Sequence, residues 1–240
     1  EVYDPHTDGW QPLAKMTTRR SAFGLAAVGG KIYAIGGHGS GHWTSSLDSV
    51  EAYDPQLGSW ALVASLSVKR RHHASVVLDG KIYAMGGCGH LTSSPVDTVE
   101  VYDPQADSWQ RVASMPQRRH SHAAAVMGGK IYVTGGYGDS QTSSVNSAYV
   151  YDPQADAWTQ LANMAIARKS HASAAVGGKL YVFGGCGGVL LTTVEIYHPD
   201  SDSWADGLSL TSLVAITLSS WWRSPRGRSL AHNSMVAVAL

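Results

Sequence analysis

The chain has 240 residues, of which 44% are hydrophobic and 15% are charged. Its 18 basic and 18 acidic residues give a formal net charge of zero, which argues against a nucleic-acid or anionic-membrane binding surface. The 26 glycines and the scarcity of helix signals favour one all-β domain of short strands joined by tight turns. No signal-peptide pattern and no apolar segment of membrane-spanning length is found, so we expect a cytoplasmic protein.

The chain opens in the middle of a repeated unit. Its Val2-Tyr3-Asp4-Pro5 motif predicts the end of a strand and a turn, because Asp accepts backbone hydrogen bonds and Pro fixes φ. A tryptophan follows each copy and is expected to open the outermost strand, where it packs against the neighbouring unit. We therefore assign the tryptophans no site role. The later copies of the motif begin at Ala52, Val101, Val150 and Ile196, and the tryptophans are Trp10, Trp60, Trp109, Trp158 and Trp204.

A nine-residue stretch, Gly128 to Gly136, marks the full units. Near-copies begin at residues 29, 79, 128 and 177, a spacing of 50, 49 and 49 residues. This spacing is too long for the common helical-pair repeats and fits a unit of four strands. The apolar residues of each copy do not alternate with polar ones, so both faces of this strand should be covered. The closing double glycine is predicted to allow a positive φ or the close approach of a neighbouring segment.

A polar crossing segment with an arginine leads into the first strand of each unit. That strand is rich in Ala, Gly, Ser and Val, as expected for the innermost strand of a ring. An arginine needed in every unit is predicted to bridge backbone carbonyls between units rather than to contact a ligand. The arginines are Arg20, Arg70, Arg119 and Arg168.

The residues that precede the innermost strands and the two cysteines are candidate metal ligands. His73, His122 and His171 share one slot with Phe23, which shows that the slot accepts an apolar ring. The chain has two cysteines, Cys88 and Cys186, which follow the double glycine of different units and do not suggest a disulfide framework.

The order of these motifs resembles the kelch repeat over about residues 1–208, and most closely that of the BTB-kelch adaptor proteins. The resemblance implies a β-propeller of four-stranded antiparallel blades. We predict four full blades at residues 19–66, 67–115, 116–164 and 165–210, preceded by a partial blade at residues 1–18. Residues 211–227 are treated as an atypical insertion and residues 228–240 as the inner strand of another partial blade. The ring should therefore be incomplete or imperfectly closed.

Function is expected in the positions that vary between units. These are the loop after each double glycine and the residues just after each crossing arginine, which should converge on one face. In the proteins that the chain resembles, these positions line a partner-binding mouth. Basic and hydroxyl groups dominate here, which favours an acidic or phosphorylated partner segment, although a solvated polar rim without a ligand is the alternative. The predicted partner-binding residues are His38, Arg71, His72, Cys88, His120, Ser121, Tyr137, Lys169, Ser170 and Cys186.

The resemblance further implies a protein-protein interaction module that presents its partner to a cullin ubiquitin ligase. That link would run through a separate BTB domain, which the 240 residues do not include. An actin-associated or other structural scaffold is a second reading, with contacts on the outer strands. A metal-dependent kelch enzyme is a third, in which His38, Cys88, Tyr137 and Cys186 gather round the axis. Asp139 is the main carboxylate expected at the mouth and has no paired acid, so we predict no catalysis, metal or cofactor.

Overall fold

The computed structural model describes residues 1–39, 45–89, 94–139 and 143–208. The insertion predicted at residues 211–227 and the inner strand predicted at residues 228–240 lie outside these ranges. The described part of the chain is all-β apart from one short 3-10 helix, η1 (Pro199–Ser201). Within it, no helix is long and apolar enough to cross a membrane.

The strands form one two-stranded sheet and four four-stranded sheets, and every pairing is antiparallel. The small sheet contains β1 (Val2–Asp4) and β2 (Gly9–Gln11). The first full sheet contains β3 (Gly24–Val28), β4 (Lys31–Ile35), β5 (Val50–Asp54) and β6 (Ser59–Val63). The second contains β7 (Ala74–Leu78), β8 (Lys81–Met85), β9 (Val99–Asp103) and β10 (Ser108–Val112). The third contains β11 (Ala123–Met127), β12 (Lys130–Thr134), β13 (Ala148–Asp152) and β14 (Ala157–Gln160). The fourth contains β15 (Ala172–Val176), β16 (Lys179–Phe183), β17 (Val194–His198) and β18 (Ser203–Asp206).

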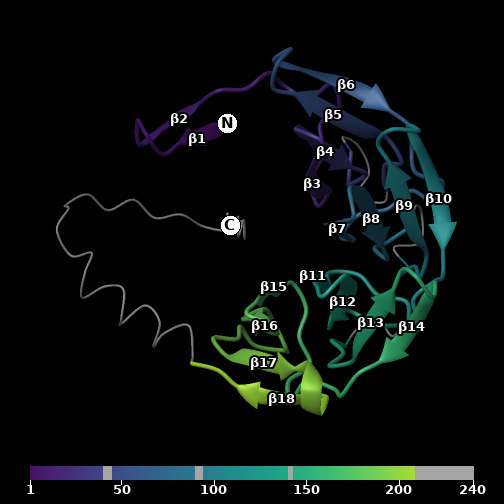
Figure 1. Ribbon diagram of the computed structural model, residues 1–240, viewed down its shortest axis with the longest axis vertical. Helices are drawn as coiled ribbons and strands as arrows, with labels where there is room; N and C mark the ends of the chain where they lie inside the picture. The colour runs from purple at the N-terminus through teal and green to yellow at the C-terminus, as the bar shows by residue number, and fades with distance from the viewer. Residues whose placement is uncertain (40–44, 90–93, 140–142, 209–240) are drawn as a thin grey trace.

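Figure 1 shows these sheets as blades arranged around a common axis. The small-residue strands β3, β7, β11 and β15 lie innermost, and the tryptophan strands β6, β10, β14 and β18 lie outermost (Figure 1). A gap separates β18 from the β1–β2 sheet, so the ring is not closed. The predicted propeller of four-stranded antiparallel blades, with an incomplete ring, is confirmed.

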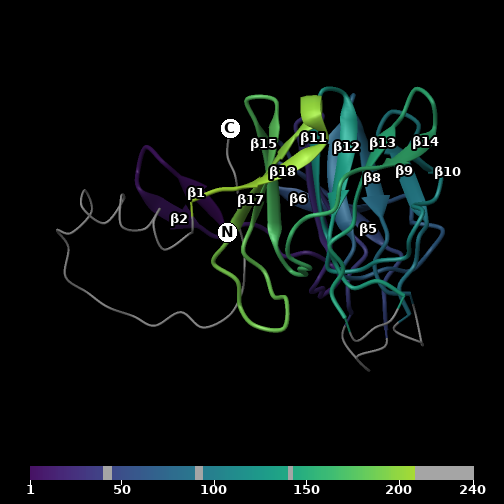
Figure 2. The ribbon, with the colours of Figure 1, turned by 90° about the horizontal axis from the view of Figure 1, so that it is seen from below.

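Because neighbouring strands are antiparallel, the connections within and between blades lie at two opposite ends of the propeller. Figure 2 shows the strands running from one end to the other. One end carries the β-hairpin turns and the Asp-Pro turns. At one such turn Asp54 accepts a backbone hydrogen bond from Gln56 over 2.9 Å, as the motif predicted. The other end carries the crossing segments and the described parts of the double-glycine loops, so these segments lie together there.

Neighbouring blades pack through aromatic and aliphatic side chains. Ile35 and Val50 of the first full blade lie in one core cluster with Ile82 and Tyr102 of the second. In each of the four full blades, the indole N–H of the tryptophan also donates to a backbone carbonyl of the preceding blade, as that of Trp109 does to Ala64 over 2.9 Å. The predicted role in packing between blades is thereby confirmed for these four tryptophans, whereas Trp10 of the small sheet is 68% exposed. The equivalent pairs are Trp60 with Ala14, Trp158 with Ala113 and Trp204 with Ala162.

The closing double glycine is required for both reasons that the sequence suggested, a positive φ and the close approach of a neighbouring segment. Gly86 and Gly87 have φ values of 62° and 98°. A Cβ on Gly86 would lie 2.6 Å from the carbonyl oxygen of Arg119 in the next blade, and one on Gly87 would lie 2.6 Å from that of Arg71. The N–H of Gly87 donates to the same Arg119 carbonyl over 2.9 Å. The double glycine therefore lets the backbones of adjacent blades meet directly.

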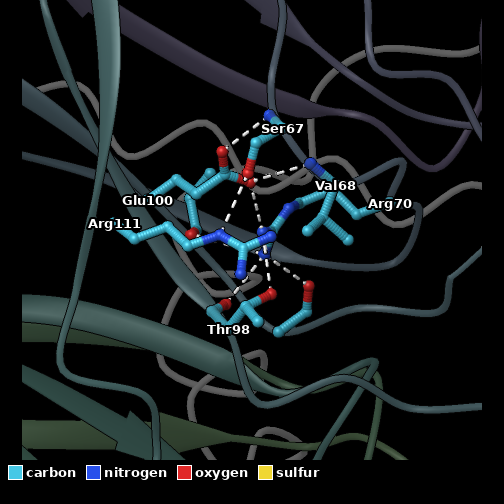
Figure 3. Close-up of polar contacts among 8 residues, drawn as sticks. Ser67, Val68, Arg70, Thr98, Glu100 and Arg111 are labelled. Carbon is cyan, nitrogen blue, oxygen red and sulfur yellow. Dashed lines mark hydrogen bonds and ion pairs between the residues drawn. The ribbon is translucent and has the colours of Figure 1, made fainter.

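The crossing arginines are fully buried, but they do not bridge blades as predicted. Arg70 donates to the carbonyls of Gly86 and Thr98, both over 2.9 Å, and these belong to the blade that the crossing segment leads into. Its guanidinium also forms an ion pair of 2.7 Å with Glu100 (Figure 3). The glutamate in turn accepts from the N–H groups of Ser67 and Val68, over 2.7 and 3.3 Å. The pair thus fastens the crossing segment to its own blade, and Arg20–Glu51 and Arg168–Glu195 repeat it.

The third full blade lacks this glutamate. Tyr149 occupies its slot, and the guanidinium carbon of Arg119 lies 4.9 Å from the centre of the tyrosine ring. Pro116 in this crossing segment has no N–H for a carboxylate to accept. The side-chain oxygen of Gln117 instead accepts from Arg119 over 3.1 Å. Because Arg119 is buried without a carboxylate on it, its pKa is lowered to about 10.

Candidate functional site

The predicted site residues lie in chain segments that meet in pairs at the loop end of the propeller. In each full blade, the residue after the double glycine exchanges two backbone hydrogen bonds with the residue after the crossing arginine. Cys88 donates to the carbonyl of Arg71 over 2.7 Å, and Arg71 donates back over 3.1 Å. The structure thus brings the two predicted sets side by side. The equivalent pairs are Ser21–His38, His120–Tyr137 and Lys169–Cys186.

The next residue of each crossing segment links the blades around the axis. The backbone N–H of Ser170 donates to the carbonyl of Ser121 over 2.7 Å, and that of Ser121 donates to His72 over 2.8 Å. The N–H of His72 completes the series by donating to Ala22 over 2.9 Å. All four residues have a positive φ, between 49° and 53°. We call these residues, Ala22, His72, Ser121 and Ser170, the axial ladder.

Side chains of three blades line up beside the ladder. The rings of His72 and His120 lie 6.2 Å apart, and those of His120 and Tyr137 lie 4.9 Å apart. The ammonium of Lys169 lies 3.8 Å from the centre of the Tyr137 ring and contacts its hydroxyl. We call His72, His120, Tyr137 and Lys169 the mouth strip. Its aromatic surface and its cation can both contact a bound segment.

The ten predicted residues differ in exposure. His72 and Ser170 are exposed, whereas His38, His120, Ser121, Tyr137, Lys169 and Cys186 are half-buried. Arg71 is only 6% exposed and donates to the hydroxyl of Ser46 over 2.7 Å, so much of its guanidinium is engaged within the fold. Cys88 is also buried, which raises the pKa of its thiol. These two residues support the mouth from behind, in contrast to the partner-facing position that we expected.

The charge at the mouth comes from Arg71 and Lys169 rather than from the histidines. Burial, with His72, Arg71 and Lys169 nearby, lowers the pKa of His120 to about 4. Although His72 has exposed surface, its ring is partly desolvated, and this desolvation together with the neighbouring Arg71 and His38 lowers its pKa. Both rings are therefore neutral near pH 7 and can act as hydrogen-bond donors and acceptors.

A cavity of about 190 Å³ opens beside the axial ladder. Besides the ladder residues, Phe23, His73 and His122 contribute to its lining. The sequence places these three residues in a common slot but does not indicate that they lie at a cavity. The only signal for it was that each ring directly follows a ladder residue in the sequence.

The slot shared by Phe23, His73, His122 and His171 is occupied by packed rings. The Cε1 atoms of His73 and His122 lie against the glycines Gly36 and Gly86 of the preceding blade, a packing contact. Among the described residues, no group of three or more His, Cys, Asp or Glu side chains could hold a metal ion. Cys88 and Cys186 are both free thiols.

Comparison with known proteins identifies kelch sequences over most of the chain. The Kelch motif matches residues 19–67 and 69–116, and the KLHDC2/KLHL20/DRC7 Kelch-repeats domain matches residues 112–212. Kelch-like protein 11 of Homo sapiens is 45% identical over 40 residues, which are 17% of this chain and 6% of that protein. The influenza virus NS1A-binding protein homolog of Mus musculus is 50% identical over 42 residues, or 18% of this chain and 6% of that protein. The matched segment thus spans only a small part of these curated relatives.

The fold also matches a solved structure. The protein YjhT superposes with a TM-score of 0.74 over 84% of this chain and 74% of its own, at 16% sequence identity. At that identity the match supports the fold alone. The motifs, the sequence matches and the blade architecture agree, and the chain therefore belongs to the kelch-repeat family of β-propellers.

Proposed function

We propose that the propeller binds a short acidic or polar segment of a partner protein at its mouth. The observation that carries this proposal is the mouth strip, which joins aromatic rings and a lysine from three blades on one face. A segment lying across the strip would contact several blades at once, and a carboxylate on it would meet the ammonium of Lys169. Charge-assisted hydrogen bonds of this kind are stronger than neutral ones.

We further propose that the propeller is the substrate-recognition part of a cullin-type ubiquitin ligase adaptor. This part of the proposal rests on the likeness to kelch-like proteins and on the resemblance to BTB-kelch adaptors. A structural scaffold, such as an actin-associated protein, is the alternative, and it would use the outer tryptophan strands. We propose binding rather than catalysis, because the mouth strip consists of two imidazoles, a phenol and an ammonium group.

Peptide binding tests the mouth directly. Fluorescent peptides with glutamate or aspartate at successive positions are titrated against the protein and against the His72→Ala, Lys169→Ala double variant. We expect acidic peptides to bind the native chain and to lose at least about tenfold in affinity in the variant, equivalent to about 1.4 kcal/mol. Arg71 is left unchanged because its buried side chain supports the fold.

The matched control is Lys179→Ala, which removes an exposed lysine at the opposite, hairpin end of the propeller. It should bind the same peptides as the native chain does. Equal weakening by both variants would point to nonspecific charge attraction and would contradict a mouth site. The adaptor role is tested separately, by asking whether a cullin co-purifies with the full-length parent protein and still does so when the mouth is mutated.

A further inference from the structure

The outer strand of the first full blade, β6, has an apolar free edge. β6 ends its sheet, and Figure 1 places it on the outer circumference of the ring. Leu62 of this strand is 65% exposed, and Leu57, in the turn that leads into the strand, is 76% exposed. In the sequence, no charged residue lies between Asp54 and Lys69. The edge therefore lacks the charges that commonly keep a free strand from pairing with another chain.

The other full blades carry polar side chains at the position of Leu62. The sheet registers place Arg111 of β10, Gln160 of β14 and Asp206 of β18 in the equivalent slot. Arg111 also donates to the hydroxyl of Ser67 over 3.1 Å. Charged side chains on an edge strand oppose its pairing with a second chain. Among these four described outer strands, only β6 has an aliphatic side chain in the slot.

Alternate residues of β6 direct their backbone groups away from the sheet. In the fourth full blade, the N–H of Gly207 donates inward to the carbonyl of Val194 over 2.8 Å. Val63 holds the position of Gly207 in the first full blade, so its backbone groups face β5. Because these groups alternate in direction along an antiparallel strand, those of Trp60 and Leu62 lie at the free edge. Among the described residues, no other backbone group bonds to them there.

A second β6 strand matches this edge in an antiparallel register that is centred on Ala61. The register places Trp60 of each copy opposite Leu62 of the other, so the outward N–H and C=O groups of both residues can bond across the edge. Trp60 and Leu62 lie on one face of the strand, where each exposed leucine meets an indole. No like charges face each other, because β6 carries none. The edge is therefore self-complementary.

A second copy also supplies this strand already folded. An edge strand needs a partner whose own edge is free, and β6 of another copy has one. Both strands are ordered by their blades, so little conformational entropy is lost when they pair. β6 has five residues, and an interface built on five residues from each copy is smaller than the about 1,200 Å² of standard stable complexes. The association should accordingly be weak and reversible.

We propose that two copies of the chain associate through their β6 strands, which joins two four-stranded sheets into one continuous antiparallel sheet. β6 lies on the circumference of the ring and the axial ladder surrounds its axis, so the association leaves the mouth strip open. The dimer presents two mouths, and a partner with two binding segments gains apparent affinity without any new contact. This two-site binding rests on the proposed function, whereas the association of the two copies does not.

Sedimentation equilibrium of the purified chain tests the association, at concentrations from about 10 μM to about 1 mM. We expect the mean mass of the native chain to rise toward that of a dimer, and Leu62→Lys to associate at least about tenfold more weakly. The matched control, Gln160→Lys, adds the same charge in the equivalent slot of β14 and should associate as the native chain does. Both positions are exposed, so both variants should keep the native thermal midpoint. A native chain that stays monomeric throughout, or native-like association of Leu62→Lys, would overturn the proposal.

Disulfide cross-linking tests the register. In the proposed pair, Ala61 of one copy lies directly opposite Ala61 of the other in a non-hydrogen-bonded pair, with Cα atoms about 4.5 Å apart. Disulfides join Cα atoms about 4.4–6.8 Å apart. We expect Ala61→Cys to form a covalent dimer with oxidised glutathione at least about tenfold faster than Thr159→Cys, the equivalent position of β14, because the pairing holds the two thiols together. Cys88 and Cys186 are kept in both variants. Equal rates would overturn the register.

The mouth variant separates this surface from the proposed function. His72→Ala with Lys169→Ala should associate as the native chain does, since both residues lie at the mouth. Loss of association in that variant would place the contact at the mouth and overturn the β6 pairing. If acidic peptides bind neither the native chain nor any variant while Leu62→Lys still weakens association, the proposed function fails and the β6 pairing stands.

Discussion

The Glu100→Gln substitution tests the buried ion pair of the second full blade. Oε1 of Glu100 accepts from Arg70 over 2.7 Å and from the N–H of Val68, while Oε2 accepts from the N–H of Ser67 over 2.7 Å. A glutamine has a single side-chain oxygen, so in either orientation its NH2 group faces a hydrogen-bond donor. The substitution also leaves Arg70 without its carboxylate, and this side chain is 0% exposed.

The expected loss is large. Removing one partner of a buried ion pair costs about 3–5 kcal/mol, and whole domains unfold with only about 5–15 kcal/mol. Equilibrium unfolding in urea measures this loss. The control in the same blade is Lys81→Met, which breaks an ion pair of 3.1 Å to Asp103 whose partners are 48% and 35% exposed. Exposed pairs contribute about 0–1 kcal/mol, so the control should change little.

The reasoning would be refuted if Glu100→Gln cost less than about 1 kcal/mol or no more than the exposed control. A small loss would mean that water or a rearranged side chain replaces the carboxylate. The third full blade shows that such a rearrangement needs other changes as well, because there Pro116 removes one N–H and Gln117 supplies an acceptor.

Three further predictions concern stability. Burial lowers the pKa of His73 to about 3 and that of His122 well below the ordinary 6.5, so below about pH 6.5 the unfolded chain binds protons that the folded chain does not. The free energy of unfolding should fall with falling pH in that range, by roughly 1.4 kcal/mol per pH unit for each histidine, as urea unfolding at several pH values would show. Gly86→Ala should lower the thermal midpoint more than Gly80→Ala does: both have positive φ, but an added Cβ lies 2.6 Å from a carbonyl only at Gly86. Equal midpoints would exclude the close approach of the backbones as the reason for the glycine. Trp109→Phe should cost about 1 kcal/mol in urea unfolding, since it removes one hydrogen bond of 2.9 Å between blades, and no loss would show that ring packing suffices.

The blade architecture could be predicted because each blade repeats the same local chemistry. The double glycine at Gly86 and Gly87 indicated a backbone that needs positive φ and close approach, and both are present. The motif around Tyr102 and Asp103 predicted a strand and its turn, and Trp109 opens the adjacent outer strand. These signals depend on residues near one another in the sequence, which is why a single chain sufficed.

The glutamate of the buried pair was missed for a physical reason. Glu51, Glu100 and Glu195 recur in one slot of the third strand, but a charged residue in a strand ordinarily indicates an exposed position. Their burial becomes favourable only when a crossing segment brings an arginine and two backbone N–H groups to the same carboxylate. That segment is about 30 residues away along the chain, as the separation of Arg70 from Glu100 shows.

The sequence by itself determined the repeat unit, the strand order within a blade and the positions of the turns. It also indicated which segments lie at the mouth end. Each blade has four antiparallel strands, so every second connection between strands falls at the same end of the propeller. Only the tertiary structure decided which of those residues are accessible. Arg71 is buried and donates to Ser46 of the preceding blade, and the rings of His73 and His122 pack against Gly36 and Gly86 of the preceding blade. Such outcomes depend on how separate blades pack around an axis, and the identities of neighbouring residues in the sequence do not specify that packing.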